Sequence, residues 1–170
     1  MMLKPQDIVI LLKLVTIGDR SWSYSTLASE LAMSPSEVHS GIGRVTAARL
    51  FDSHRKVPIL KALLEFLLHG VKYAYPPKRG HLTRGMPTSY AAPPLNRLIS
   101  QPDEPPPVWP DPEGEVRGYE FSPLYRSVPK AAARDDALYE LLTLVDAIRD
   151  GRARERELAV KEITARLDNA

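Results

Sequence analysis

Apolar residues recur at helical spacing along much of the chain, and this pattern predicts most of its secondary structure. Ile8, Leu11, Leu12 and Val15 follow the i, i+3, i+4, i+7 spacing of a buried helix face, which predicts a helix over 5–17. Similar patterns, bounded by capping residues or glycines, predict further helices over 25–31, 35–50, 58–69, 134–150 and 152–167. The chain is therefore expected to be mainly α-helical.

The third of these helices carries a clear start signal and an unusual interior. Ser34 can cap it, Pro35 suits the first helical position, and Glu37 follows three residues after the cap, which completes a capping box. Gly41 and Gly43 then cost about 1 kcal/mol each relative to alanine. We interpret Gly41 as a position where this helix packs closely on the helix over 25–31, and Gly43 as bare backbone on the outward side.

Two kinds of segment break the helical pattern. "VKYAY" at 71–75 alternates β-branched and aromatic residues and predicts a strand, with "TSYAA" as its return strand and one more short strand within "VRGYEFSPLY", which gives a small β component. Residues 93–130 hold 10 of the 16 prolines, so an extended arm or linker is expected there. This segment is either a plain connector or an arm docked on the rest of the chain and pinned by Trp109.

The charge is divided unevenly along the chain. Residues 1–100 contain 13 Lys and Arg and 6 Asp and Glu, a balance of +7, whereas residues 101–170 contain 10 and 15, a balance of −5. A basic N-terminal part is the electrostatic signature of a module that binds a polyanion such as nucleic acid. An acidic C-terminal part suits a protein partner.

Composition and motifs exclude several classes of function. The chain has no cysteine, so it has no disulfide, thiol nucleophile or cysteine-bound zinc, which fits a cytoplasmic protein. The four histidines lack metal-ligand spacing, and there is no phosphate loop or nucleophile elbow. We therefore expect no enzyme, metal or cofactor. The apolar run from Ile8 to Ile17 is interrupted by Lys13 and is too short to span a membrane, so no membrane association is expected.

Residues 25–51, "STLASELAMSPSEVHSGIGRVTAARLF", resemble the helix-turn-helix of winged-helix proteins, similar to MarR-like bacterial transcriptional regulators. The resemblance is carried by the short helix, the small-residue turn, the "MSPSEVH" start of the next helix and the closing "ARLF". It implies a winged helix-turn-helix-like DNA-binding domain over 1–92, in which the helix over 5–17 completes a three-helix core. The proline-rich arm or linker over 93–130 and a C-terminal helical pair over 131–170 would follow.

The resemblance also implies a recognition helix that enters the major groove of double-stranded DNA by its N-terminal residues. Ser36 and the helix N-terminus would meet phosphate, and His39, Ser40 and Arg44 would reach bases or backbone. Glu37 is needed for the capping box. The predicted DNA-binding residues of this helix are therefore Ser34, Ser36, Glu37, His39, Ser40, Gly43 and Arg44.

The chain departs from the family pattern after Phe51. A winged helix would continue into a two-stranded wing, but the apolar helix over 58–69 follows instead. The basic segment over 78–84 is then either a displaced wing, with Lys78, Arg79 and Arg84 near the minor groove or phosphates, or an ordinary solvent loop.

These features predict a sequence-specific DNA-binding transcriptional regulator. A homodimer is expected because two recognition helices multiply specificity, with helix 58–69 and the apolar stripe over 138–148 as candidate surfaces. The alternative is the antitoxin or partner subunit of a bacterial toxin–antitoxin or phage-defence pair, which binds a protein partner such as a toxin. An RNA-binding helper is a third hypothesis, although no aromatic stacking platform for single strands is evident.

Overall fold

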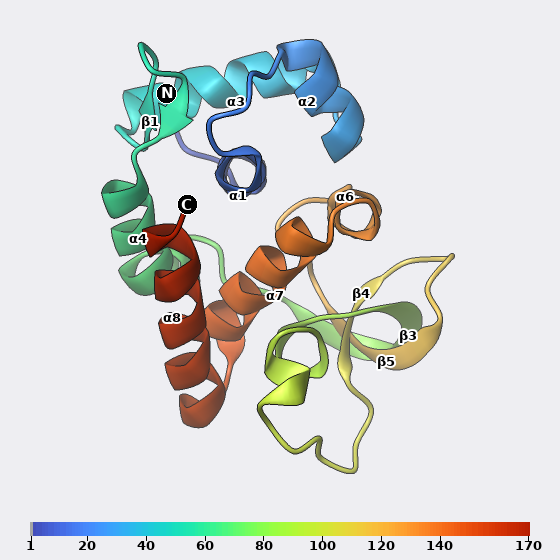
Figure 1. Cartoon of the computed structure of the whole chain (residues 1–170). Helices are drawn as coiled ribbons and strands as arrows, with labels where there is room; N and C mark the ends of the chain where they lie inside the picture. The colour runs from blue at the N-terminus through green and yellow to red at the C-terminus, as the bar shows by residue number, and fades with distance from the viewer. Residues whose placement is uncertain (1) are drawn as a thin grey trace.

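The computed structural model describes residues 2–170, which form layers of helices with a small sheet at one side (Figure 1). The fold is mixed and contains more helix than strand. The α-helices are α1 (Pro5–Ile17), α2 (Tyr24–Leu31), α3 (Pro35–Ala47), α4 (Leu60–His69), α5 (Val71–Ala74), α6 (Val128–Ala133), α7 (Asp136–Asp150) and α8 (Ala153–Asp168). The strands are β1 (Phe51–Asp52), β2 (Val57–Pro58), β3 (Arg79–Pro87), β4 (Pro107–Pro110) and β5 (Val116–Phe121), and two 3₁₀ turns, η1 and η2, span Ser89–Ala91 and Leu95–Arg97.

α1 lies at the centre of the helical layers. It contacts α3 on one side and α7 on another, and the five residues from Ile8 to Leu12 have no exposed surface. A helix buried on all sides requires apolar residues all around it, which explains the unbroken apolar run. Lys13 is the charge within that run, and its ammonium group pairs with Asp135 at 2.8 Å.

The segment after α1 forms two short helices and a hairpin. The capping box of α3 is confirmed, because the Ser34 hydroxyl accepts from the Glu37 amide at 3.1 Å and the Glu37 carboxylate accepts from the Ser34 amide at 3.5 Å. Soon after α3 ends, β1 and β2 pair as an antiparallel hairpin in which Phe51 faces Pro58. A two-stranded hairpin therefore follows the third helix directly.

α7 joins the helical layers to the sheet. Its Asp146 carboxylate is buried and accepts hydrogen bonds from Thr88 at 2.7 Å, from the Trp109 indole at 2.7 Å and from Arg149 at 2.8 Å. The Arg149 guanidinium also donates to the carbonyl of Tyr75 at 2.9 Å. A buried carboxylate is tolerated only when it is paired and hydrogen-bonded, and these donors come from separate parts of the chain.

The proline-rich segment is folded rather than free. β3 pairs antiparallel with both β4 and β5, and β4 pairs parallel with β5, so the three strands close on one another. Trp109 has no exposed surface, in agreement with the docked alternative. The predicted boundary after residue 92 separates strands that pair, because β3 precedes it and its partners follow it.

Several local predictions were wrong. The strand expected over 71–75 is instead the helical turn α5 (Val71–Ala74), and the helix expected from Pro58 begins at Leu60 because Pro58 belongs to β2. Residues 89–91 form a 3₁₀ turn, and the expected loop over 78–84 lies mostly in β3. Short segments have weak intrinsic preferences, and here tertiary packing decides their conformation. The stripe over 138–148 is buried against the rest of the chain and is not a dimer surface.

Replacing Trp109 by Phe is expected to lower the free energy of unfolding by about 1–3 kcal/mol, because it leaves the buried Asp146 carboxylate short of a donor. Trp22→Phe is the matched control, since the Trp22 indole donates to the exposed carbonyl of Lys56, which water can satisfy. Urea denaturation of the two variants measures the difference. Equal losses would contradict the role given to the buried bond.

Candidate nucleic-acid interface

α3 presents a narrow outward face of small residues. Ser36, His39, Ser40 and Ala47 are exposed, whereas Val38, Ile42 and Val45 are buried. The imidazole of His39 lies against the Tyr24 ring of α2, with 5.1 Å between the ring centroids. The structure thus brings Ser34, Ser36, His39, Ser40 and Gly43 together on one side of α3, as predicted. This helix runs along the top of Figure 1.

The N-terminus of α3 is held by more than its own capping box. The Tyr125 hydroxyl donates a hydrogen bond to the Glu37 carboxylate, and the Arg126 guanidinium lies 3.8 Å from the same group. The bond from Tyr125 is the main cause of a lowered pKa for Glu37. Glu37 was predicted among the DNA-binding residues, but its carboxylate has structural partners in both the capping box and the 122–127 loop.

Arg44 does not point outward, which corrects its predicted role. Its guanidinium donates to both carboxylate oxygens of Asp7 in α1, at 2.7 and 2.9 Å, and the Asp7 side chain has no exposed surface. These bonds raise the pKa of Arg44. A bidentate pair with a buried carboxylate fixes the guanidinium between the two helices, so Arg44 supports the face without belonging to it.

The two glycines of α3 have opposite surroundings. A Cβ atom at Gly41 would lie 2.5 Å from Ile10 Cδ1 and 3.0 Å from Asp7 Oδ1, so this glycine allows α3 to approach α1. The prediction that Gly41 packs on α2 was therefore wrong. A Cβ atom at Gly43 would meet nothing within 4 Å, as expected for the outward side.

The β1–β2 hairpin adds a basic tip beside α3 that sequence reasoning missed. Its four connecting residues, 53–56, are all exposed and include His54, Arg55 and Lys56. The Asp52 carboxylate fixes the turn by accepting from the amides of His54 at 3.0 Å and Arg55 at 3.1 Å. Within residues 2–170, no carboxylate lies within 4 Å of the charged groups of Arg55 or Lys56.

The signal for this hairpin was present but weak. "FDSHRKVP" places an aspartate, which favours turns, before a basic run, with apolar residues on both sides. Strands of two residues carry too little alternation to be predicted from pattern alone.

The basic segment over 78–84 lies elsewhere. Lys78, Arg79 and Arg84 belong to β3 or precede it, and Figure 1 shows this strand on the opposite side of the molecule from α3. Arg79 pairs with Asp150 at 3.5 Å and covers the Phe121 ring, and Arg84 reaches the carbonyl of Gly114 at 3.5 Å. The structure does not bring these residues to the face formed by α3.

No group of three or more potential metal ligands occurs among the residues that the structure describes. None of the described helices has both the length and the apolar character needed to cross a membrane. Comparisons with protein-family models, with curated proteins and with solved structures gave no match.

Gly43→Ala is expected to raise the free energy of unfolding by about 1 kcal/mol, because alanine has the higher helix propensity and the site is open. Gly41→Ala is expected to lower it by about 1 kcal/mol or more, because the added methyl group overpacks the contact with Ile10. Thermal or urea unfolding compares the pair. Stabilisation by both substitutions would contradict the close contact between α1 and α3.

Arg44→Ala is expected to cost about 3–5 kcal/mol, because it leaves the Asp7 carboxylate buried without its partner. Arg55→Ala, on the exposed hairpin tip, is the control and is expected to change stability by less than about 0.5 kcal/mol. Urea denaturation provides both values. A loss below about 1 kcal/mol for Arg44→Ala would show that the pair is not a main support of α3.

Proposed function

We propose that this protein is a DNA-binding transcriptional regulator with a winged helix-turn-helix at its N-terminus. The observation that carries the proposal is the capped helix α3, whose small polar face is exposed next to a basic hairpin tip. In this assignment α1, α2 and α3 form the three-helix core, α3 is the recognition helix, and the β1–β2 hairpin is the wing.

The position of the hairpin supports this assignment better than the segment over 78–84. It follows α3 directly, and β1 packs against α3 while β2 packs against α1. Its tip carries unpaired cations, the side chains that bind backbone phosphates. The wing is therefore short and lies at residues 51–58.

The exposed residues of α3 and of the hairpin tip contact different parts of the duplex in this proposal. The hydroxyl and the backbone amide of Ser36 meet a phosphate, because Pro35 has no N–H group and the Glu37 amide is used in the capping box. His39 and Ser40 contact base edges, and Gly43 allows close approach of the backbone. Arg55 and Lys56 bind phosphates beside the groove. A reading face with so few long side chains supports binding in which backbone contacts supply most of the affinity.

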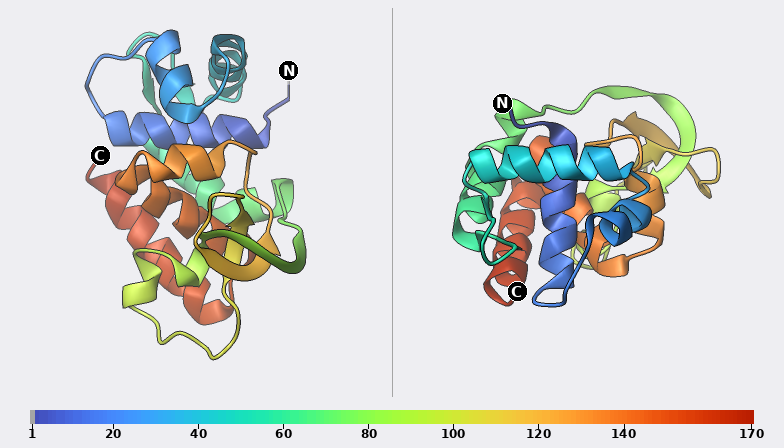
Figure 2. Two further views of the ribbon diagram at one scale, coloured as in Figure 1. Left: turned by 90° about the vertical axis from the view of Figure 1, so that its right-hand side faces the viewer. Right: turned by 90° about the horizontal axis from the view of Figure 1, so that it is seen from above.

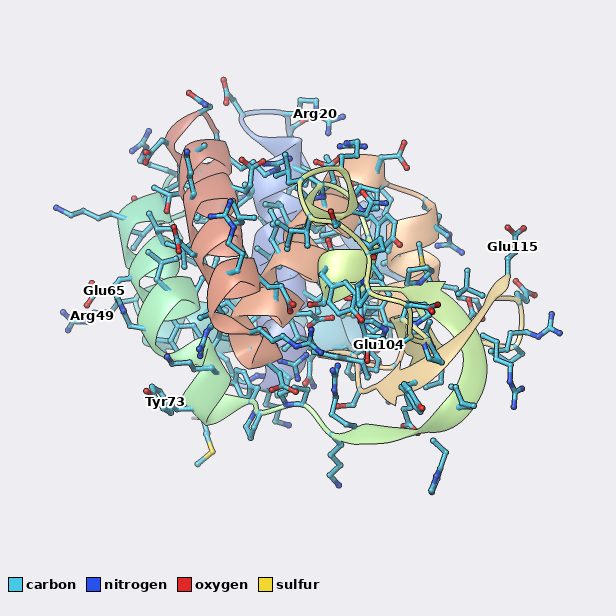
Figure 3. The ribbon with its side chains drawn as sticks, turned by 90° about the horizontal axis from the view of Figure 1, so that it is seen from below. Arg20, Arg49, Glu65, Tyr73, Glu104 and Glu115 are labelled. Atoms are coloured by element: carbon cyan, nitrogen blue, oxygen red, sulfur yellow. The ribbon has the colours of Figure 1, made fainter. Side chains whose placement is uncertain are left out.

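The homodimer stays a prediction. Because the stripe over 138–148 is buried, α4 is the remaining one of the two predicted dimer surfaces. Leu64 and Leu68 are partly exposed on this helix, and Ile59 before it is 38% exposed. Tyr73 of the following turn is 77% exposed and points away from the molecule (Figure 3).

The alternative, a partner subunit that binds another protein, is supported by a different face. Leu82 and Tyr119 are direct neighbours across β3 and β5 and are 41% and 45% exposed, and the same face carries the facing pair Arg84 and Arg117. The proline-rich segment does not support it, since its strands pair with β3 within the chain.

Titration of the purified protein with the duplex upstream of its own gene, over about 50–200 mM salt, tests the DNA-binding function. A random duplex of equal length is the control for sequence preference. We expect tighter binding to the upstream duplex and a steep loss of affinity with salt. Absence of binding to either duplex at low salt would contradict the proposal and favour the alternative.

Replacing both Arg55 and Lys56 by Ala is expected to weaken duplex binding and to reduce the slope of log affinity against log salt by roughly 2, because two phosphate contacts are lost. The double variant Arg79→Ala with Arg84→Ala is the matched control, since it removes the same charge from the opposite side of the molecule. Fluorescence anisotropy measures both slopes. If the two variants lose affinity equally, the effect reflects net charge and the hairpin is not the wing.

A further inference from the structure

The loop between β5 and α6, residues 122–127, reaches the N-terminus of α3 from a distant part of the chain. Tyr125 donates its hydroxyl hydrogen to the Glu37 carboxylate, and the Arg126 guanidinium lies 3.8 Å from Glu37. Arg126 also stacks on the Tyr125 ring, at 4.7 Å from its centroid. The helix that follows, α6, packs against α2. The C-terminal part of the chain is therefore built onto the helix-turn-helix.

The Arg126 side chain contacts Tyr125 and Glu37 but remains largely exposed to solvent. Its exposed fraction is 79%. An ion pair this exposed contributes about 0–1 kcal/mol, so stability does not account for the arginine. Stacking on the Tyr125 ring restricts the side chain while its donors stay accessible, which lowers the entropy cost of binding an anion.

The position of Arg126 complements that of the hairpin tip. α3 has 13 residues and is about 20 Å long. The hairpin lies beside the C-terminal end of α3, as the right-hand view in Figure 2 shows, and the loop that carries Arg126 contacts Glu37 in the first turn at the other end. The recognition helix therefore has an exposed cation source at each end: Arg55 and Lys56 at one, and Arg126 at the other.

A cation at the N-terminal end of α3 offsets the negative charge of Glu37. The N-terminus of a helix attracts phosphate, but the capping box places a carboxylate there, which repels it. A glutamate carboxylate is ionised at neutral pH, and the hydrogen bond from Tyr125 lowers the pKa of Glu37 further. Arg126 supplies the opposite charge at the same place.

We propose that Arg126 binds a backbone phosphate of duplex DNA at the N-terminal end of α3, and that Tyr125 is a positioning residue that holds it there. This inference rests on the proposed function. It makes the C-terminal part of the chain a direct contributor to the DNA interface, and gives the narrow reading face of α3 a phosphate contact beyond each of its ends.

Arg126→Ala tests the contact, with Arg117→Ala as matched control, because Arg117 is an exposed arginine of β5 on the outward face of the sheet. Both variants are titrated with the upstream duplex and the random duplex over the same salt range. Arg126→Ala is expected to weaken binding to both duplexes by about 3-fold to 10-fold at low salt and to reduce the salt slope by about 1. Arg117→Ala is expected to leave affinity and slope unchanged.

Tyr125→Phe tests the positioning role. It keeps the ring under Arg126 and removes only the hydrogen bond to Glu37. We expect weaker binding with an unchanged salt slope, because the charge remains but is less well placed. In the background of Arg126→Ala, the same substitution is expected to have no further effect on affinity, since residues in contact act together.

The experiment separates failure of the proposed Arg126 contact from failure of the proposed DNA-binding function. If the unsubstituted protein binds DNA and Arg126→Ala binds with the same affinity and slope, the contact does not exist and the inference is overturned. If Arg126→Ala and Arg117→Ala lose affinity equally, the effect is general charge, which also overturns it. If the unsubstituted protein binds neither duplex, the proposed function itself fails. Circular dichroism melting checks that each variant is folded.

Discussion

The close crossing of α3 over α1 is the constraint on which the outward face depends. Gly41 removes the side chain that would separate the helices, and the bidentate pair of Arg44 with the buried Asp7 closes the contact. Because Asp7 has no exposed surface, this pair holds the rotation of α3 about its axis as well as its distance from α1. Ser36, His39 and Ser40 face solvent as a consequence of contacts made on the other side of the helix.

A second buried carboxylate organises the opposite half of the molecule. Asp146 gathers Thr88, Trp109 and Arg149, and so ties α7 to the sheet and to the segment that leads into it. The apolar core is continuous from the helices around α1 to Trp109 and Phe121 of the sheet. The basic and acidic parts of the sequence therefore share one hydrophobic core. The uneven distribution of charge does not mark a boundary between two separately packed domains.

The features that could be predicted from sequence are those encoded by neighbouring residues. The capping box at Ser34 and the six longer helices depend on spacings of three or four residues and were found, the helices to within three residues at each end, whereas the short α5 and α6 were not. The hairpin over 51–58 was missed because its strands are stabilised by packing against α1 and α3 rather than by their own pattern. Arg44 was assigned outward because its partner, Asp7, lies 37 residues away and nothing local marks the pair. The same limit hid Arg126, whose contact with Glu37 joins residues far apart in the sequence.

The contact between Tyr125 and Glu37 has a further physical consequence. The residue that completes the cap of α3 is also the residue that receives the C-terminal part of the chain. Any displacement of the β5–α6 loop changes the partners of Glu37 and therefore the electrostatic environment at the N-terminus of α3. That loop leads back through β5 to β3, whose outward face carries the exposed Leu82 and Tyr119. The face best suited to a protein partner and the helix proposed to read DNA are therefore joined by a short, continuous path of covalent and hydrogen-bonded structure.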